Sequence, residues 1–324
     1  MKTRLIYAVL VATVTSLGLA GQAMAEFPER PIKLIVPFPA GSSTDTVARI
    51  IAPAMSDKLG QPVVVENQPG ASGAIGALAV ASAHPDGYTI GLGTTTTLAT
   101  APALNPNLPY KPAKDFAPIG MITSAPYVLS VSTNLRVDSV AALVKKAKSA
   151  PGKVRYASAG PASLARLAGA LFAKEAGVKL THIPYKTSAQ SVLDLVAGRV
   201  DMQFGTIPPV LPHIQSKKIV ALAVTGSKRA SVLPNVPTLQ EVGYKDYDVS
   251  LWQALVAPAA TPKGVVAKLN GALAAALADT KVAHTLAAQG QVPAAGSSEA
   301  LSKRMGTETV QWTKVGQEAG LIAK

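Results

Sequence analysis

The stretch that decides the fold is Val36-Pro37-Phe38-Pro39-Ala40-Gly41-Ser42-Ser43-Thr44-Asp45. The β-branched run before it, Ile32-Lys33-Leu34-Ile35-Val36, predicts a strand that ends at Pro37. Residues 44–59 have the composition of a helix, and Gly60 supplies its end. A strand, a short loop and a helix in this order form the repeating unit of α/β proteins.

The loop between this strand and this helix has the features of an anion-binding site. We expect Ser43 or Thr44 to cap the helix, because short hydroxyl side chains accept hydrogen bonds from first-turn N–H groups. The remaining N–H groups point outward with the positive end of the helix dipole. Gly41 allows a ligand oxygen to approach the main chain closely. A capped helix start that binds only water is the alternative interpretation.

The same arrangement occurs a second time, in Tyr156-Ala157-Ser158-Ala159-Gly160-Pro161-Ala162-Ser163-Leu164. Because open α/β sheets bind ligands at the carboxyl ends of their strands, we expect the two loops to face each other across a cleft. A third candidate, Gly93-Thr94-Thr95-Thr96-Thr97, offers four hydroxyl groups after a predicted strand. A solvated turn is the alternative for this third segment.

Short β-branched runs alternate with alanine-rich helical stretches along the chain, which predicts an α/β fold with largely parallel sheets. Further strands are expected at 62–66, 88–92, 127–132, 154–157, 180–183, 202–204, 219–224 and 251–256. Further helices are expected at 70–83, 139–149, 163–176, 189–197, 263–278 and 298–318.

Two domains are expected, because the 299 residues after Ala25 exceed the size at which a single core usually stops growing. The order of elements places the second domain as an insertion in the first. Lobe 1 would comprise residues 26–126 and 249–324, and lobe 2 residues 127–248. Two chain crossings between the lobes are what hinge closure over a cleft requires.

The first 25 residues read as a secretory signal peptide. Lys2 and Arg4 precede an apolar stretch from residue 5 to about residue 20, and Ala23-Met24-Ala25 supplies the cleavage pattern. A transmembrane anchor, the alternative, needs a longer apolar run. We therefore expect cleavage after Ala25 and a periplasmic location. The absence of cysteine suits an oxidising compartment and rules out a lipid anchor on an N-terminal cysteine.

The chain is basic, with 31 Lys and Arg against 18 Asp and Glu and a net charge of +13, or +11 after loss of the signal peptide. It has no Lys/Arg-rich run with interleaved aromatic residues, so we expect no nucleic-acid partner. The charge indicates either mild steering of anionic ligands or a merely solvated surface.

Enzymatic and metal-binding patterns are missing from the sequence. Gly70, Gly73 and Gly76 have the spacing GxxGxxG and not the dinucleotide-binding GxGxxG, so close helix packing explains them better. The four histidines are scattered without an HExxH motif, which predicts no metal site. No GxSxG motif occurs and no serine has a recognisable base beside it. We expect a protein without cofactor or catalytic activity.

Many short blocks, in the correct order along the chain after the signal peptide, resemble the Bug family, the tripartite tricarboxylate transporter substrate-binding proteins or TctC-like periplasmic receptors. Two of these blocks are Pro184-Tyr185-Lys186 and Pro234-Asn235-Val236-Pro237-Thr238, and the others lie at 31–38, 41–45, 48–49, 59–67, 69–71, 85–89 and 222–225.

The resemblance implies a type II periplasmic binding protein, with two α/β lobes around a ligand cleft and a two-strand hinge. It also implies a small di- or tricarboxylate, or an aromatic carboxylate, held by main-chain N–H groups and ordered waters. The implied partner is a membrane permease of two subunits, contacted transiently by a monomeric receptor. The expected ligand-binding residues are Phe38, Pro39, Ala40, Gly41, Ser42, Ser43, Thr44, Asp45, Thr95, Thr96, Ser158, Gly160, Pro161, Ala162, Ser163, Arg166 and Thr206.

The chain also departs from the family's usual pattern. Ser42 stands where a second glycine is usual in the first loop, and Ala162 replaces a glycine in the second. Arg166 replaces a common histidine, and Ala170 a common glutamate, which favours a dianionic ligand. A sensor or adaptor for a signalling system and a secreted hydrolase are the competing functions.

Overall fold

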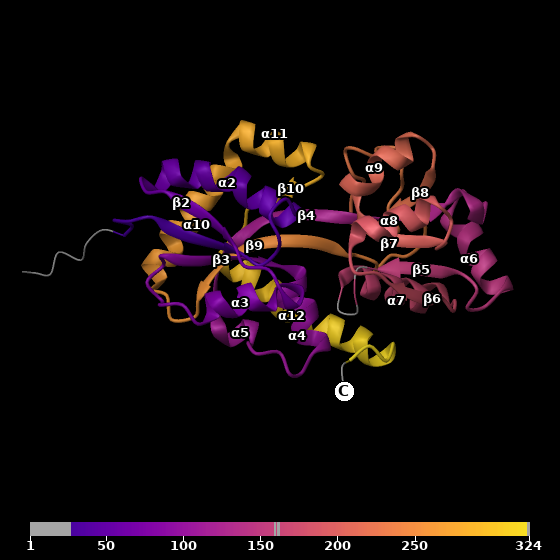
Figure 1. The fold of residues 1–324 in the computed structure, drawn as a ribbon, viewed down its shortest axis with the longest axis horizontal. Coiled ribbons are helices and arrows are strands. Elements are labelled where there is room, and N and C mark those ends of the chain that lie inside the picture. Colours follow the sequence, from indigo (N-terminus) through magenta and orange to yellow (C-terminus); the bar gives the residue numbers. More distant parts are fainter. Residues whose placement is uncertain (1–26, 159, 161–162, 323–324) are drawn as a thin grey trace, which may run out of the picture.

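The computed structural model describes residues 27–158, 160 and 163–322. The expected signal peptide, and Pro161 and Ala162 of the second loop, lie outside the described residues. Two groups of strands, each covered by helices, form the molecule (Figure 1).

The first group contains strands from both ends of the chain, in the order β2-β1-β3-β9-β4. These strands are β1 (Ile32–Val36), β2 (Val63–Asn67), β3 (Thr89–Thr94), β9 (Ser250–Pro258) and the first part of β4 (Phe116–Ser132), with the short β10 (Val292–Pro293) on β4. The second group contains β5 (Arg155–Ser158), β6 (Thr181–Pro184), β7 (Met202–Thr206) and β8 (Ile219–Val224) with the rest of β4.

Strand β4 belongs to both groups. It pairs with β9 as far as Pro126, which lies opposite Ser250, and from Tyr127 it pairs with β7. The outgoing chain thus changes partners at 126/127, and the returning chain enters the first group at Ser250. The predicted lobe boundaries fall at these two positions. The division into lobes stays a prediction, which this change of partners supports.

The sheets are mixed, so the expectation of largely parallel sheets is wrong. The β1–β2, β1–β3, β5–β6 and β5–β7 pairs are parallel, whereas every pairing of β4 and β9 is antiparallel. The reason is the crossing itself. A strand that leaves one lobe and a strand that returns to it run in opposite directions, and each adds to a sheet of βαβ units.

Helices cover both faces of the first group (Figure 1). One face carries α2 (Ser43–Leu59), α10 (Lys263–Ala278) and α11 (Thr280–Ala288), and the other α3 (Ala74–Ala81), α4 (Ala101–Leu104), α5 (Pro112–Asp115) and α12 (Ser298–Glu318). The second group is covered by α6 (Val140–Ser149), α7 (Leu164–Ala176), α8 (Ser188–Val196) and α9 (Ile207–Gln215). None of the described helices is both long enough and apolar enough to cross a bilayer.

The sequence predicted most of these elements, but it missed the first part of β4, the one-turn helices α4 and α5, and the longer helices α9 and α11. Helix α9 contains Pro208, Pro209 and Pro212, which argue against a helix in a sequence pattern. The first two lie in the first turn, where an N–H has no intrahelical acceptor and its loss does little harm. Helix α11 is capped by the Asp279 carboxylate, which accepts from the N–H groups of Lys281 and Val282 at 2.8 and 3.1 Å.

The GxxGxxG segment serves close packing, as predicted. A Cβ atom on Gly76 would lie 2.8 Å from both the main-chain oxygen of Gln68 and the Cα of Pro37. Helix α3 therefore packs directly on the start of the first loop, and the ring of Phe38 lies against Gly73. The packing of α3 thus supports the first loop.

Candidate ligand-binding site

The first loop begins its helix one residue earlier than predicted. Ser42, and not Ser43 or Thr44, is the N-cap: its backbone is extended and its Oγ accepts from the N–H of Asp45 at 3.2 Å. Gly41 precedes it with φ +77°, in the left-handed region that favours glycine. The side chain of Ser42 thus performs the capping.

The Asp45 carboxylate organises this loop from inside. Only 3% of Asp45 is exposed. Its oxygens accept from the N–H of Gly41 at 2.8 Å, from Arg49 Nε at 3.0 Å and from Asn67 Nδ2 at 2.9 Å. Burial opposes its charge, but the hydrogen bonds from Arg49, Gly41 and Asn67 outweigh burial and hold the pKa of Asp45 below its usual value. Asp45 and Arg49 neutralise each other, so Asp45 shapes the loop through contacts within it.

Two main-chain donors of the first loop remain available to a ligand. The N–H groups of Gly41 and Ser42 are used by Asp45 and by the carbonyl of Pro39. Within the described residues, the N–H groups of Ser43 and Thr44 donate no hydrogen bond. These are the first two N–H groups of a 17-residue helix, where the dipole favours an anion. Pro39, Ala40 and Ser43 are exposed beside them.

The second lobe has a small polar cavity of about 60 Å³. Its lining is dominated by hydroxyl and amide side chains, and no Lys, Arg, Asp or Glu is among the described residues around it. The polar lining residues are Tyr127, Ser158, Ser163, Ser188, Ser191, Gln203 and Thr206. Four of these were not predicted: Tyr127, Ser188, Ser191 and Gln203.

Three helices begin at this cavity. Ser163 caps α7 by accepting from the N–H of Arg166 at 3.3 Å, and Thr187 caps α8 by accepting from the N–H of Gln190 at 3.3 Å. Thr206 precedes α9 and makes no side-chain cap. The positive ends of three helix dipoles therefore meet at one cavity that lacks a charged side chain, which suits an anionic group.

The two sets of donors flank one short stretch of β4. In the first lobe, Ser43 is linked through Gln291 to Thr123 of β4. In the second, Thr206 lies opposite Tyr127. From Thr123 to Tyr127 the extended strand makes four residue steps, which span about 13 Å.

Ser158 has a histidine beside it, so the expectation that no serine has a nearby base is wrong. His182, which is far away in sequence, places its Nε2 2.7 Å from Ser158 Oγ. Ser158 Oγ also lies 3.1 Å from the carbonyl oxygen of Gly160, and the tautomer of His182 decides which partner of the Ser158–His182 pair donates. Burial and the charge of Arg166 lower the pKa of His182 to about 4. Arg166 is half-buried and is not among the residues that line the cavity.

The third predicted segment has a structural role in this structure. Thr95 is fully buried, and its Oγ1 accepts from the N–H of Trp252 at 2.8 Å. That bond ties the end of β3 to β9. Thr96 begins the next helical turn and is partly exposed. Trp252 packs at the crossing strands and is completely buried.

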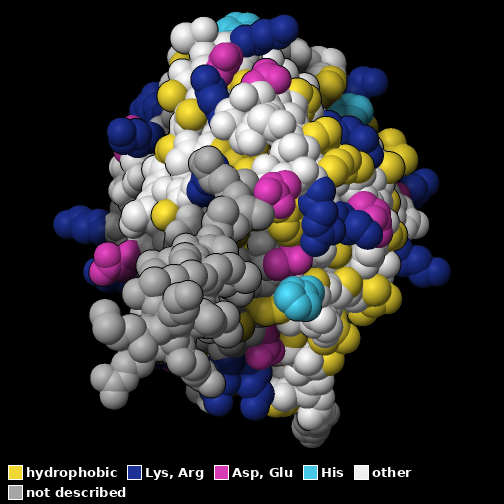
Figure 2. Space-filling model, turned by 90° about the vertical axis from the view of Figure 1, so that its left-hand side faces the viewer, with side chains coloured by type: hydrophobic (Ala, Val, Ile, Leu, Met, Phe, Trp, Pro, Cys, Tyr) yellow, Lys and Arg dark blue, Asp and Glu magenta, His cyan; other side chains and the backbone are white. Residues whose placement is uncertain are grey.

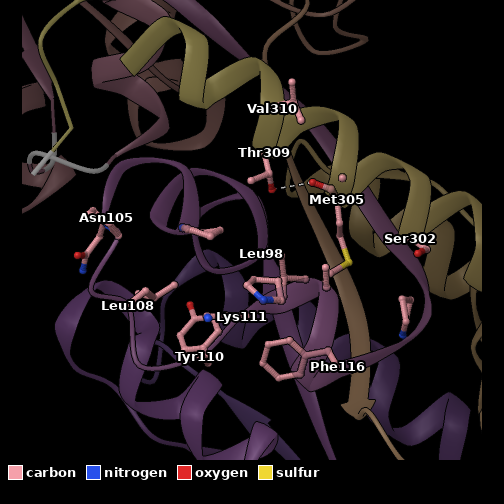
Figure 3. Close-up of a pocket in the computed structure, with 16 residues that line it drawn as sticks. Leu98, Asn105, Leu108, Tyr110, Lys111, Phe116, Ser302, Met305, Thr309 and Val310 are labelled. Carbon is pink, nitrogen blue, oxygen red and sulfur yellow. Dashed lines mark hydrogen bonds between the residues drawn. The ribbon is translucent and has the colours of Figure 1, made fainter. Parts of the chain in front are cut away.

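A larger cavity of about 400 Å³ lies elsewhere, between the segment from Leu98 to Pro118 and helix α12 (Figure 3). Apolar side chains dominate its walls, with Leu98, Tyr110 and Phe116 on one side and Met305 and Val310 of α12 on the other. Among the described residues, the charged one in its lining is the exposed Lys111, and none of the loops predicted as binding segments contributes to that lining. The hydroxyl-lined cavity fits a carboxylate better than this apolar one.

Charge is dispersed at the first-lobe end of the molecule. Figure 2 shows Lys and Arg side chains scattered over that face, with Asp and Glu between them. The described part of the chain also contains no cluster of three or more His, Asp or Glu residues able to hold a metal ion.

The fold and its paired strand-to-helix loops define a type II periplasmic binding protein. Residues 47–321 match the family model described as "Tripartite tricarboxylate transporter family receptor". The chain belongs to this family. Protein BugT of Bordetella pertussis is 38% identical over 324 residues, covering 99% of each chain.

Solved structures agree with this assignment. The periplasmic binding protein BugD is 37% identical and superimposes with a TM-score of 0.78 over 92% of this chain and 100% of that one. R. palustris Rpa4515 with adipate is 36% identical, with a TM-score of 0.81 over 91% of this chain and 99% of that one.

The pKa of His182 makes stability depend on pH. Between about pH 6.5 and pH 4 the unfolded chain takes up a proton at His182 that the folded chain resists, so the free energy of unfolding should fall as the pH falls through this window. One proton gives at most about 1.4 kcal/mol per pH unit. His182→Gln should flatten this slope in urea unfolding without ligand. His284→Gln, at an exposed position on α11, is the control and should keep it. Equal slopes for wild type and His182→Gln would contradict this account.

Proposed function

We propose that this protein is a periplasmic receptor that binds a small organic carboxylate in the gap between its lobes and delivers it to a membrane permease. The observation that carries the proposal is the pairing of the free N–H groups of Ser43 and Thr44 with the three helix starts around the second-lobe cavity. The adipate bound by Rpa4515 supports a dicarboxylate among the possible ligands.

The proposed site binds a negatively charged carboxylate without a free positively charged side chain among the described residues. Arg49 is already paired with Asp45, and the second-lobe cavity is lined by neutral polar groups among the described residues. Each hydrogen bond to a charged oxygen contributes about 1.5–3 kcal/mol. Three or four such bonds suffice for micromolar affinity after the costs of association. One carboxylate group of a tricarboxylate or of an aromatic carboxylate would accept the same hydrogen bonds.

Binding would favour closure of the lobes about β4 and β9. A ligand shifts a conformational equilibrium only by its differential affinity for the two states. A carboxylate that touches both loops gains its full set of hydrogen bonds only when the lobes approach. Two continuous strands as the connection allow this hinge motion while they keep the register of each sheet.

The proposal also includes export through a signal peptide that is cleaved after Ala25. In the periplasm the receptor would be a monomer and would contact a two-subunit permease transiently. A signalling adaptor would use the same pocket with a different membrane partner, and capture from membranes by the ligand-loaded protein distinguishes the two. A hydrolase is disfavoured, because burial and the charge of Arg166 hold the pKa of His182 at about 4 and so oppose proton transfer to it from Ser158.

A thermal-shift panel of adipate, malate, citrate, glutamate and benzoate tests the proposed function. A ligand present at 100 times its Kd adds about 2.7 kcal/mol to the stability of the folded state, so its melting temperature should rise clearly. At least one carboxylate should produce this rise, and its uncharged amide should not. A flat response to every member of the panel would refute the proposal.

Removal of a single main-chain donor tests the site itself. Ser43→Pro deletes the N–H of Ser43 at the first helical position, where proline fits a helix well, and Ser42 is already extended as a residue before proline must be. Loss of one charge-assisted hydrogen bond should weaken the Kd roughly tenfold or more relative to Ser43→Ala, which keeps the N–H. Isothermal titration with the panel's best ligand measures this. Equal affinities of the two variants would remove Ser43 from the site.

A further inference from the structure

A buried glutamine 248 residues away from Ser43 contacts the first loop. Gln291 follows α11 and is only 1% exposed. Its Nε2 donates to Ser43 Oγ at 3.2 Å, so its amide is bonded to the first residue of α2. No feature of the sequence brings these two residues together.

The other end of the same amide is bonded to both crossing strands. Gln291 Oε1 accepts from Thr123 Oγ1 of β4 at 3.0 Å and from Gln253 Nε2 of β9 at 3.4 Å. Thr123 and Gln253 are completely buried and pair with each other in the sheet. One side chain thus joins the helix that carries the Ser43 and Thr44 donors to the two strands that connect the lobes.

This polar link is not the packing that stability alone would favour. Gln253 Oε1 is buried and accepts no hydrogen bond from the described residues. A buried polar atom without a partner destabilises the folded state. Apolar side chains of similar size would avoid that penalty, but they would not fix the direction of the Ser43 side chain.

The turn that carries Gln291 also contacts the second lobe. The adjacent Gly290 has φ +67°, and a Cβ atom there would lie 3.4 Å from the Pro208 ring. Pro208 follows Thr206, which lines the second-lobe cavity, by two residues. The turn therefore lies between the donor helix of one lobe and the start of α9 in the other.

We propose that Gln291 is a positioning residue for the carboxylate site: it fixes the start of α2 against β4 and β9, so that the Ser43 and Thr44 N–H groups face the second lobe. This inference rests on the proposed function. Gln291 touches no ligand in this scheme and acts through the hydroxyl of Ser43.

A double-mutant cycle tests the inference by titration of the five panel carboxylates. Gln291→Met keeps the volume and removes the hydrogen bonds, and should weaken the strongest binder roughly fivefold to tenfold. Ser43→Ala should weaken it similarly. The double variant should bind no more weakly than the weaker single variant, because both changes break one link. Gln289→Met, an exposed position in the same turn, is the control and should bind like wild type.

The outcomes separate the two proposals. Additive losses, or a Gln291→Met variant that melts earlier yet binds like wild type, would overturn the positioning role and leave the receptor function standing. Wild-type protein that binds none of the five carboxylates would overturn the receptor function, and the inference with it. Non-additive losses with a control that binds normally would establish the link.

Discussion

The continuity of β4 through both sheets is the constraint on which the rest of the structure depends. Its 17 residues pair with β9 up to Pro126 and with β7 from Tyr127 onward. One strand therefore sets the distance between two sets of βα loops that are separate in sequence. The position of β4 fixes where the carboxyl ends of β1, β5 and β7 lie. It therefore also fixes the helices that begin at those strand ends. A binding site with residues from two lobes needs one element that sets the distance between them.

The pairing of Asp45 with Arg49 in the first loop and the absence of charged side chains among the described residues around the second-lobe cavity leave main-chain N–H groups and hydroxyls as the available donors. Asp45 accepts hydrogen bonds from Arg49 and from the Gly41 N–H, and Ser163 and Thr187 cap their helices. The groups left over are first-turn N–H groups and hydroxyls. These donors are held rigidly by the folds they belong to, so they need little reorganisation when an anion arrives. Family membership and the adipate bound by a relative agree with this chemistry.

Local features were predictable from the sequence, and long-range contacts were not. The two loops were identified because proline, glycine and serine mark the end of one element and the start of the next, and Gly60 ended α2 as expected. The first half of β4 was missed because Pro118 and Pro126 interrupt its pattern, although a bulge and a partner change accommodate them. His182 and Gln291 reach the loops only through tertiary packing, so no spacing in the sequence could indicate their contacts.

The central claim, that amides at helix starts of both lobes bind the anion, is tested most directly by amide-resolved NMR during titration with the best carboxylate. The account predicts large downfield shifts for the Ser43 and Thr44 amide protons, together with changes at the starts of α7 and α8. Shifts confined to the apolar cavity between Leu98 and Met305, with Ser43 and Thr44 unmoved, would contradict it.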